Sequence, residues 1–109
     1  MYSGVFPAII TPFLEDMSLD EEGLKRNVLH LCQTGIAGIV PCGTTGEAAT
    51  LTIAEHKRVI EITVENSSVP VIAGTGSNNT REAVELTCHA AEAGADAATF
   101  GVIGSLKAS

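Results

Sequence analysis

The clearest chemical pattern in the chain is the pentapeptide Gly43-Thr44-Thr45-Gly46-Glu47, which directly follows an apolar run. Its two glycines permit positive φ angles and a close approach of the backbone to a ligand. Successive N–H groups in such a loop converge on one anion, the threonine hydroxyls add donors, and a hydroxyl there can also pass protons. The pattern predicts a loop that binds a carboxylate or phosphate; a tight turn that merely uses glycine and threonine is the alternative.

A second glycine-rich run, Gly74-Thr75-Gly76-Ser77-Asn78-Asn79, begins like the dinucleotide-binding fingerprint G-x-G-x-x-G. It has Asn79 in place of the last glycine and follows the third apolar run of the chain, whereas the fingerprint follows the first strand. We therefore interpret it as a turn whose Asn79 caps the next helix.

The residue types that bind metals show no metal-ligand spacing, so the sequence predicts no metal site and no cofactor. Three histidines are scattered over predicted helices, at His30, His56 and His89. Three cysteines are interpreted as small buried thiols in a reducing compartment, at Cys32, Cys42 and Cys88.

Short apolar runs alternate with longer amphipathic segments along the chain. The runs are rich in Val, Ile and Ala, which is typical of parallel strands buried on both faces, and they lie at Val5–Ile10, Ala37–Cys42, Val69–Ala73 and Ala97–Ile103. Their starts are 32, 32 and 28 residues apart, close to the about 30 residues of a βαβ unit.

Each segment between these strands carries a helix start signal, a capping residue with Glu three positions later: Ser18 with Glu21, Thr52 with Glu55, and Asn79 with Glu82. Gly35 and Gly94 are predicted to end the first and third helices. Both of these helices have an apolar stripe suited to packing on a sheet, formed by Leu24, Val28, Leu31 and Cys32 and by Ala83, Leu86, Ala90 and Ala91.

This βαβαβαβ order predicts an α/β fold with parallel strands, either an open doubly wound sheet or part of a closed eight-stranded barrel. In both architectures ligands bind at the carboxyl ends of the strands, where the pentapeptide is expected.

The overall composition excludes several classes of protein. The chain has a net charge of −7, and 45% of its residues are hydrophobic against 17% charged. We expect no nucleic-acid partner, because an acidic surface repels phosphate, and no membrane span. The apolar start, residues 1–13, lacks a basic segment and contains Pro7 and Pro12, so it does not fit a signal peptide and a cytoplasmic location is expected.

Four motifs in this order resemble the family of pyruvate-dependent Schiff-base lyases and aldolases represented by dihydrodipicolinate synthase. They are Thr11-Pro-Phe, Gly43-Thr-Thr-Gly-Glu-Ala-Ala-Thr-Leu, Glu55-His-Lys and Pro70-Val-Ile-Ala-Gly-Thr-Gly-Ser-Asn, and the resemblance spans about residues 4 to 98. Relatives such as N-acetylneuraminate lyase tend to have Ser at the position of Thr44, so Thr44 favours the synthase branch.

The resemblance implies that residues 1–98 form the first three and a half β/α units of a (β/α)8 TIM barrel. It implies condensation of pyruvate with aspartate semialdehyde through a lysine Schiff base in lysine and diaminopimelate biosynthesis, by a homo-oligomeric enzyme. The Thr45 backbone and hydroxyl, with the Thr44 N–H, would hold the pyruvate carboxylate between Gly43 and Gly46, and the Thr44 hydroxyl would join a proton relay between two tyrosines.

Members of the family that lysine inhibits have a second site, and Ala49, His56, Asn78 and Glu82 are similar to residues that line it. Ile53 replaces a histidine often found there, which argues against inhibition of this chain by lysine.

Residues 99–109 diverge from the family, whose fourth strand leads into a Thr-Pro-Tyr-Tyr segment, and Tyr2 is the chain's one tyrosine. No lysine fits the Schiff-base role, since Lys25 and Lys57 fall on predicted helices and Lys107 lies in the divergent segment. We expect a frameshift, truncation or incomplete gene model, no catalysis by this chain alone, and open strand edges that self-associate. A non-catalytic association module, another pyruvate aldolase and a phosphate or nucleotide binder remain the alternatives.

Overall fold

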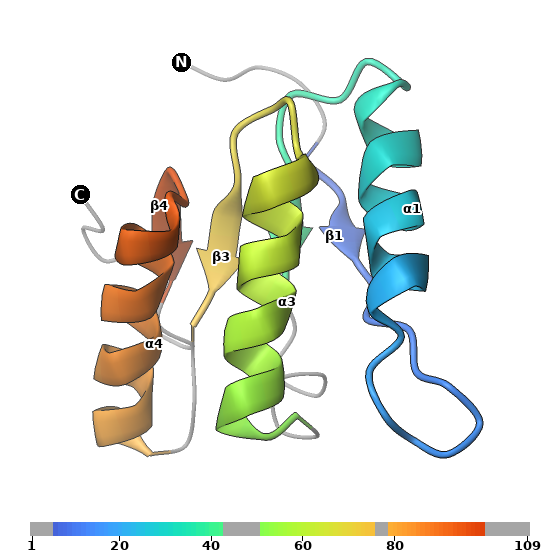
Figure 1. Ribbon diagram of the computed structural model, residues 1–109. Helices are drawn as coiled ribbons and strands as arrows, with labels where there is room; N and C mark the ends of the chain where they lie inside the picture. Colours follow the sequence, from blue (N-terminus) through green and yellow to red (C-terminus); the bar gives the residue numbers. More distant parts are fainter. Residues whose placement is uncertain (1–5, 43–50, 76–78, 100–109) are drawn as a thin grey trace.

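The computed structural model describes residues 6–42, 51–75 and 79–99 (Figure 1). Strands and helices alternate along these residues, as the sequence predicts. The strands are β1 (Ala8–Ile9), β2 (Val40–Pro41), β3 (Ile72–Gly74) and β4 (Ala97–Thr99). The helices are α1 (Glu21–Cys32), α3 (Ile53–Asn66) and α4 (Thr80–Ala93).

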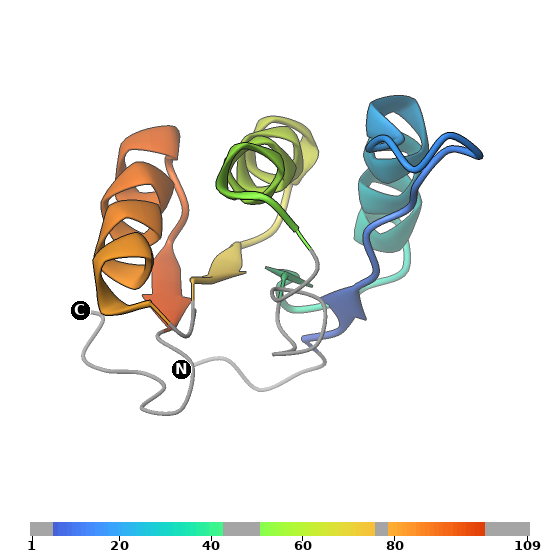
Figure 2. The same ribbon diagram turned by 90° about the horizontal axis from the view of Figure 1, so that it is seen from below.

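The strands are parallel and follow one another in chain order. β1 pairs with β2, with Ile9 opposite Pro41, and β3 pairs with β4, with Ala73 opposite Ala98. A parallel bridge between Ile39 and Val71 joins the two pairs. All three helices lie on one face of this sheet (Figure 2), whereas a doubly wound sheet carries helices on both faces. The doubly wound alternative is therefore wrong for the described part of the chain.

The strands are shorter than their apolar runs, and prolines account for part of the difference. Proline has no N–H to donate to a neighbouring strand. Pro41 occupies the last position of β2, while Pro7 and Pro70 precede β1 and β3 and contribute only carbonyls, which accept from the N–H groups of Val40 and Ile39. Regular pairing is thereby confined to two or three residues per strand.

Two of the three predicted helix starts are confirmed. Thr52 caps α3 in a capping box, in which its hydroxyl accepts from the Glu55 N–H and its own N–H donates to the Glu55 carboxylate. Asn79 caps α4 by accepting from the N–H groups of Arg81 and Glu82. At the other end, Gly94 terminates α4 with a φ of 105°, the left-handed conformation that glycine adopts without strain.

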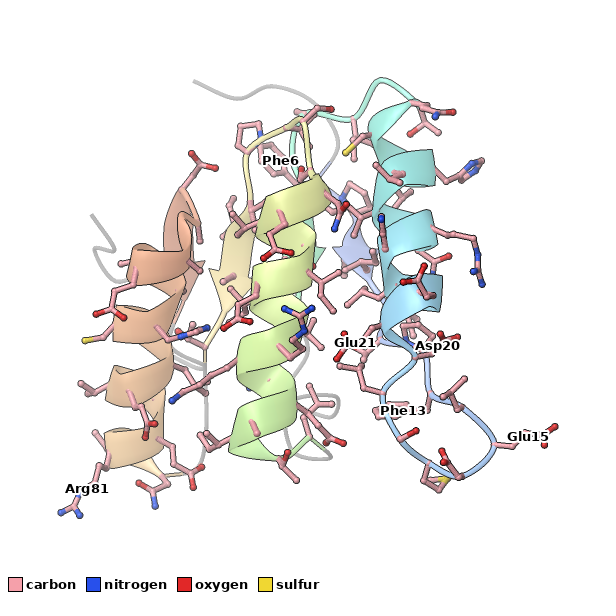
Figure 3. All side chains as sticks on the ribbon, viewed as in Figure 1. Phe6, Phe13, Glu15, Asp20, Glu21 and Arg81 are labelled. Atoms are coloured by element: carbon pink, nitrogen blue, oxygen red, sulfur yellow. The ribbon has the colours of Figure 1, made fainter. Side chains whose placement is uncertain are left out.

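The start of α1 was predicted at Ser18 and lies two residues later. Phe13 and Leu19 form an antiparallel bridge, so the chain is still in a hairpin at Ser18, where both donors of this serine bond to Asp16. Asp20 is the first residue beyond the hairpin and accepts from the Gly23 N–H at 2.9 Å. Figure 3 shows Asp20 at the base of α1 and Glu15 on the projecting hairpin.

The end of α1 also differs slightly from the prediction. The helix stops at Cys32 with Gln33 as its cap, and Gly35, with a φ of 79°, lies in the turn that follows. The turn still requires a positive φ, which glycine adopts easily, but α1 ends before Gly35.

The core lies between the helices and the sheet. Its larger cluster joins side chains of α1 and α3 to the strands, among them Leu24, Val28, Val59, Ile39 and Val71. The stripe predicted for α1 is confirmed, since Leu31 and Cys32 pack against the same cluster. The stripe predicted for α4 is confirmed at Ala83, Leu86 and Ala90, but Ala91 is exposed because it faces away from the sheet.

The two faces of the sheet differ in burial. Ile9 points toward the helices and is 4% exposed, while the next residue, Ile10, is 77% exposed. Because side chains alternate along a strand, Ile10 projects from the face opposite to α1, α3 and α4. The prediction of strands buried on both faces is therefore wrong at β1 within this chain.

Among the described residues no helix combines the length and apolar character needed to cross a membrane.

Candidate ligand site at the carboxyl edge of the sheet

All four strands point toward the same edge of the sheet, and the first turns of α3 and α4 lie at that edge (Figure 1). Buried side chains with polar or thiol groups follow three of the strands: Thr11 two residues after β1, Cys42 directly after β2, and Thr75 directly after β3. They are 4%, 3% and 0% exposed, respectively. Parallel α/β folds bind their ligands at this edge, which makes it the candidate site.

Cys42 has a backbone conformation that non-glycine residues seldom adopt. Its φ is 57°, and among the described non-glycine residues only Met17, in the hairpin, shares a positive φ. Such a conformation costs on the order of 1 kcal/mol and persists where the surrounding structure holds it, often at functional sites. The chain therefore leaves the sheet at the residue directly before Gly43, where the predicted anion-binding pentapeptide begins.

The end of β3 is bonded to α3 by His56. Its imidazole Nε2 lies 2.6 Å from the carbonyl oxygen of Gly74, the last residue of β3. A carbonyl only accepts, so Nε2 carries the proton and donates it. The ring is 3% exposed, which makes this a hydrogen bond inside the protein.

The residue after Gly74 is bonded to α4. The hydroxyl oxygens of Thr75 and Thr87 lie 2.9 Å apart, and the Thr87 hydroxyl is 2.9 Å from the Ala83 carbonyl. A hydroxyl has one proton, and Thr87 donates its proton to that carbonyl. Thr75 is therefore the donor in the pair with Thr87.

Most of the predicted site residues lie outside the described residues. These are Gly43, Thr44, Thr45, Gly46, Ala49 and Asn78. Two residues predicted for the lysine site are described: His56 is buried and bonded to Gly74, and Glu82 lies in the first turn of α4 with its N–H bonded to the Asn79 cap. Both stand in first helical turns at the carboxyl edge.

Thr87 is a structural residue of this edge that the sequence analysis missed. Its position on α4 resembles that of an ordinary helix threonine, and no spacing rule links it to Thr75. A threonine directly after Leu86, beside a helix stripe otherwise made of Ala and Leu, is the one sequence signal that singles it out.

The three cysteine side chains lie in different environments. The three cysteines differ in burial: Cys42 is buried, Cys32 is half-buried and Cys88 is exposed on α4. The prediction of buried thiols is therefore correct for Cys42 and wrong for the other two: Cys32 lies at the end of α1 and is only partly covered, and Cys88 lies on an exposed face of α4.

A cluster of charged groups lies on the helical layer, between α1 and α3. Arg58 on α3 lies 3.2 Å from Glu21 of α1 and 3.1 Å from Glu61, and the hydrogen bond that Arg58 donates to Glu61 is the main reason that its pKa is raised. A pocket of about 250 Å³ lies between the later turns of α3 and α4, lined by Glu61, Glu65, His89, Glu92 and Ala93.

This pocket is not placed to serve the candidate site, because the first turns of α3 and α4, not their later turns, lie at the carboxyl edge. His89 Nε2 is 3.1 Å from a Glu61 oxygen, at ion-pair distance but without hydrogen-bond geometry. In the described ranges no group of three or more His, Cys, Asp or Glu side chains is arranged to hold a metal ion.

Comparison with known proteins identifies the family. The family model described as the dihydrodipicolinate synthetase family matches residues 1–101. The chain is 71% identical over 98 residues to the 4-hydroxy-tetrahydrodipicolinate synthase of Methanothrix thermoacetophila, which covers 90% of this chain and 33% of that protein. It is 62% identical over 96 residues to the synthase of Methanosarcina mazei. The chain thus spans about a third of the length of these curated relatives.

Solved structures agree with this assignment. A crystal structure of dihydrodipicolinate synthase from Aquifex aeolicus matches with a TM-score of 0.81 and 47% identity, over 91% of this chain and 34% of that one. N-acetylneuraminate lyase from Mycoplasma synoviae matches with a TM-score of 0.84 and 35% identity, over 91% of this chain and 35% of that one. Together with the parallel sheet and its edge, these matches show that the chain belongs to the dihydrodipicolinate synthetase family.

Proposed function

We propose that this chain supplies the pyruvate-carboxylate cradle of a 4-hydroxy-tetrahydrodipicolinate synthase, the enzyme that condenses pyruvate with aspartate semialdehyde in lysine and diaminopimelate biosynthesis. The observation that carries the proposal is the position of Cys42. A left-handed residue at the carboxyl end of a central strand directly precedes the Gly43-Thr44-Thr45-Gly46 motif in a chain 71% identical to such a synthase.

In this proposal residues 1–98 are the first three and a half β/α units of a (β/α)8 barrel, and residues 99–109 are a divergent segment that begins at the last residue of β4. The consecutive parallel strand order with helices on one face supports it, because a closed barrel is built from successive units of this kind. A typical barrel of this class needs about 250 residues.

The carboxylate of pyruvate would bind the Thr44 N–H and the backbone and hydroxyl of Thr45, and the Thr44 hydroxyl would pass a proton. Gly43 and Gly46 would let those N–H groups converge. The cradle orients the substrate without forming a covalent bond. Substrates are small molecules in a soluble, homo-oligomeric, cytoplasmic enzyme that uses no cofactor.

We infer that this chain does not itself provide the amine for the Schiff base. Such an amine must be desolvated beside the substrate so that its pKa falls. Lys25 lies on the exposed side of α1, and Lys57 on α3 forms an ion pair with Glu85 at 2.6 Å. Neither faces the carboxyl edge as a free, buried amine.

Borohydride trapping tests whether the Schiff-base amine lies on this chain or on another polypeptide. The chain is incubated with pyruvate, reduced with borohydride and measured by intact mass, alone and together with the remaining two thirds of the Methanothrix thermoacetophila synthase expressed as a separate polypeptide. We expect no adduct on this chain and a reduced pyruvate adduct on the added polypeptide only in the mixture. An adduct on this chain would show that the amine assignment is wrong.

Binding of pyruvate by the chain tests the cradle directly. In an NMR titration we expect pyruvate to shift the amide signals of Thr44 and Thr45. Thr45→Val should abolish the shifts, since it removes a donor from the cradle, while Thr34→Val, an exposed threonine after α1, should leave them unchanged. Equal shifts in both variants would contradict the cradle.

A non-catalytic association module is the second candidate, because Ile10 is 77% exposed on the face of the sheet opposite to α1, α3 and α4. Failure of pyruvate binding together with tight self-association would favour it. N-acetylneuraminate lyase is a weaker candidate, since the identity to that enzyme is 35%. Tight nucleotide binding in calorimetry would instead favour a phosphate or nucleotide binder.

The lysine-site assignment of Ala49, His56, Asn78 and Glu82 stays a prediction, and Ile53 argues against lysine inhibition. Calorimetry with L-lysine should show no binding; saturable binding lost in Glu82→Gln would contradict that expectation.

A further inference from the structure

The end of β3 is held from two sides by side chains of different helices. His56 of α3 donates to the Gly74 carbonyl at 2.6 Å, and Thr87 of α4 accepts from the Thr75 hydroxyl at 2.9 Å. The carbonyl of the peptide unit between Gly74 and Thr75 is therefore bonded to α3, and the side chain of Thr75 is bonded to α4. All three elements belong to separate parts of the chain.

Neither bond is needed to form the helix that contributes it. The first turn of α3 is already capped by the reciprocal bonds of Thr52 and Glu55. Helix α4 begins at the Asn79 cap, and Thr87 lies in its middle. The two side chains instead reach out of their helices to the point where β3 leaves the sheet.

His56 also stands close in sequence to the predicted cradle. It is one turn into α3, the helix that follows the 43–50 segment, while Gly74 ends the neighbouring strand. A bond between them joins the chain that leaves the cradle to the next strand end along the edge. Burial makes such a bond costly to lose, because water cannot readily replace the donor.

We propose that His56 and Thr87 are positioning residues, which fix the peptide unit between Gly74 and Thr75 at the carboxyl edge, and that pyruvate binding depends on this fixed strand end. This inference rests on the proposed function for its effect on pyruvate. The geometry of the Gly74 peptide can be tested without pyruvate.

Three variants separate positioning from folding. His56→Leu removes the donor, His56→Gln returns an amide N–H near the place of Nε2, and Thr87→Val keeps the shape of the side chain without the hydroxyl. In an NMR titration of the full chain we expect His56→Leu to weaken pyruvate binding about tenfold, the effect of losing one buried hydrogen bond. His56→Gln should recover most of the affinity, and Thr87→Val should weaken it a few-fold.

A second measurement reports on the peptide itself. The ¹⁵N resonances of the His56 ring should show a protonated Nε2, and the Thr75 amide should exchange with solvent more slowly in the original chain than in His56→Leu. Thermal unfolding accompanies each variant. If His56→Leu does not fold, His56→Gln and Thr87→Val decide the question.

The outcomes distinguish the two proposals. Absence of pyruvate binding in the original chain contradicts the proposed function, and the ring resonances and Thr75 exchange then decide the positioning role. Unchanged pyruvate affinity in both His56→Leu and Thr87→Val overturns the positioning role, as does a ring protonated at Nδ1 only. Loss of affinity that His56→Gln does not restore, with an equal loss of thermal stability, also overturns it.

Discussion

At the residue scale, Cys32 shows how contacts between distant parts of the chain tune one group. It is the last residue of α1, and its sulfur accepts from the Ser68 N–H at 3.4 Å and lies 3.6 Å from the Ser67 hydroxyl. Burial raises the pKa of the thiol, but the hydrogen bonds with Ser68 and Ser67 together lower it more, so the pKa lies below its ordinary value. The turn after α3 thereby stabilises the thiolate.

We expect Ser67→Ala to raise the pKa of Cys32, because it removes one of the groups that stabilise the thiolate. The measurement is the rate of alkylation of Cys32 against pH, read by peptide mass spectrometry, and the rise in rate should move to higher pH in the variant. Cys88, exposed on α4, is the internal reference and should keep the same profile in both proteins. Superimposable Cys32 profiles would contradict the prediction.

The same shift has a consequence for stability with a definite sign. A thiol whose pKa is lower in the folded state than in the unfolded state stabilises the fold at pH above its unfolded-state pKa. This stabilisation is lost as the pH falls through the folded-state pKa. The thiolate bonds of Cys32 therefore contribute in alkaline solution only.

At the element scale, the first turn of α3 carries the capping box that starts the helix at the carboxyl edge. Thr52→Ala removes the hydroxyl that accepts from the Glu55 N–H at 3.1 Å. We expect it to lower the free energy of unfolding by about 1 kcal/mol, the usual cost of losing such a cap. Urea unfolding measures the change.

Thr80→Ala is the matched control for this cap. Thr80 is exposed at the first position of α4 and follows the Asn79 cap without being one. Its substitution should change the unfolding free energy by less than about 0.5 kcal/mol. An equal effect of the two substitutions would show that Thr52 does not act as a cap.

The helices and strands also show which structural features can be predicted from the sequence. The alternation of strands and helices, the caps Thr52 and Asn79 and the stripe of α1 follow from local patterns, and the structure confirms them. The start of α1 does not follow, because the hairpin bridge between Phe13 and Leu19 overrides the signal at Ser18. Strand lengths depend on which N–H groups find partners across the sheet, which no single run of residues reveals.

The candidate site, too, can be predicted from the sequence only in part. The edge at which ligands bind follows from the parallel order, and Gly43 to Gly46 are marked by their own residue types. The bonds of His56 and Thr87 depend on which helix face meets which strand end, and that is a property of the packed layers. Sequence reasoning therefore predicts a ligand loop, which lies outside the described residues, but not the side chains that hold the end of β3.

At the scale of the whole molecule, the two outer strands of the sheet have one described partner each: β1 pairs only with β2 and β4 only with β3 within the described residues. The helices cover one face, and Ile10 is 77% exposed on the other. Edge strands with apolar side chains beside them favour pairing with another chain. We therefore expect the purified 109-residue chain to self-associate and to bind a hydrophobic dye.

Ile10→Lys tests which surface drives this association. A charge on the face opposite to α1, α3 and α4 must be desolvated when two copies meet there, so the variant should shift sedimentation toward the monomer and reduce dye fluorescence. Leu29→Lys is the matched control, since Leu29 is 41% exposed on α1, away from the open face of the sheet. It adds the same charge and should leave association unchanged. A dye-silent monomer of the original chain at all concentrations would contradict the prediction, and equal effects of the two lysines would show that net charge rather than the open face governs association.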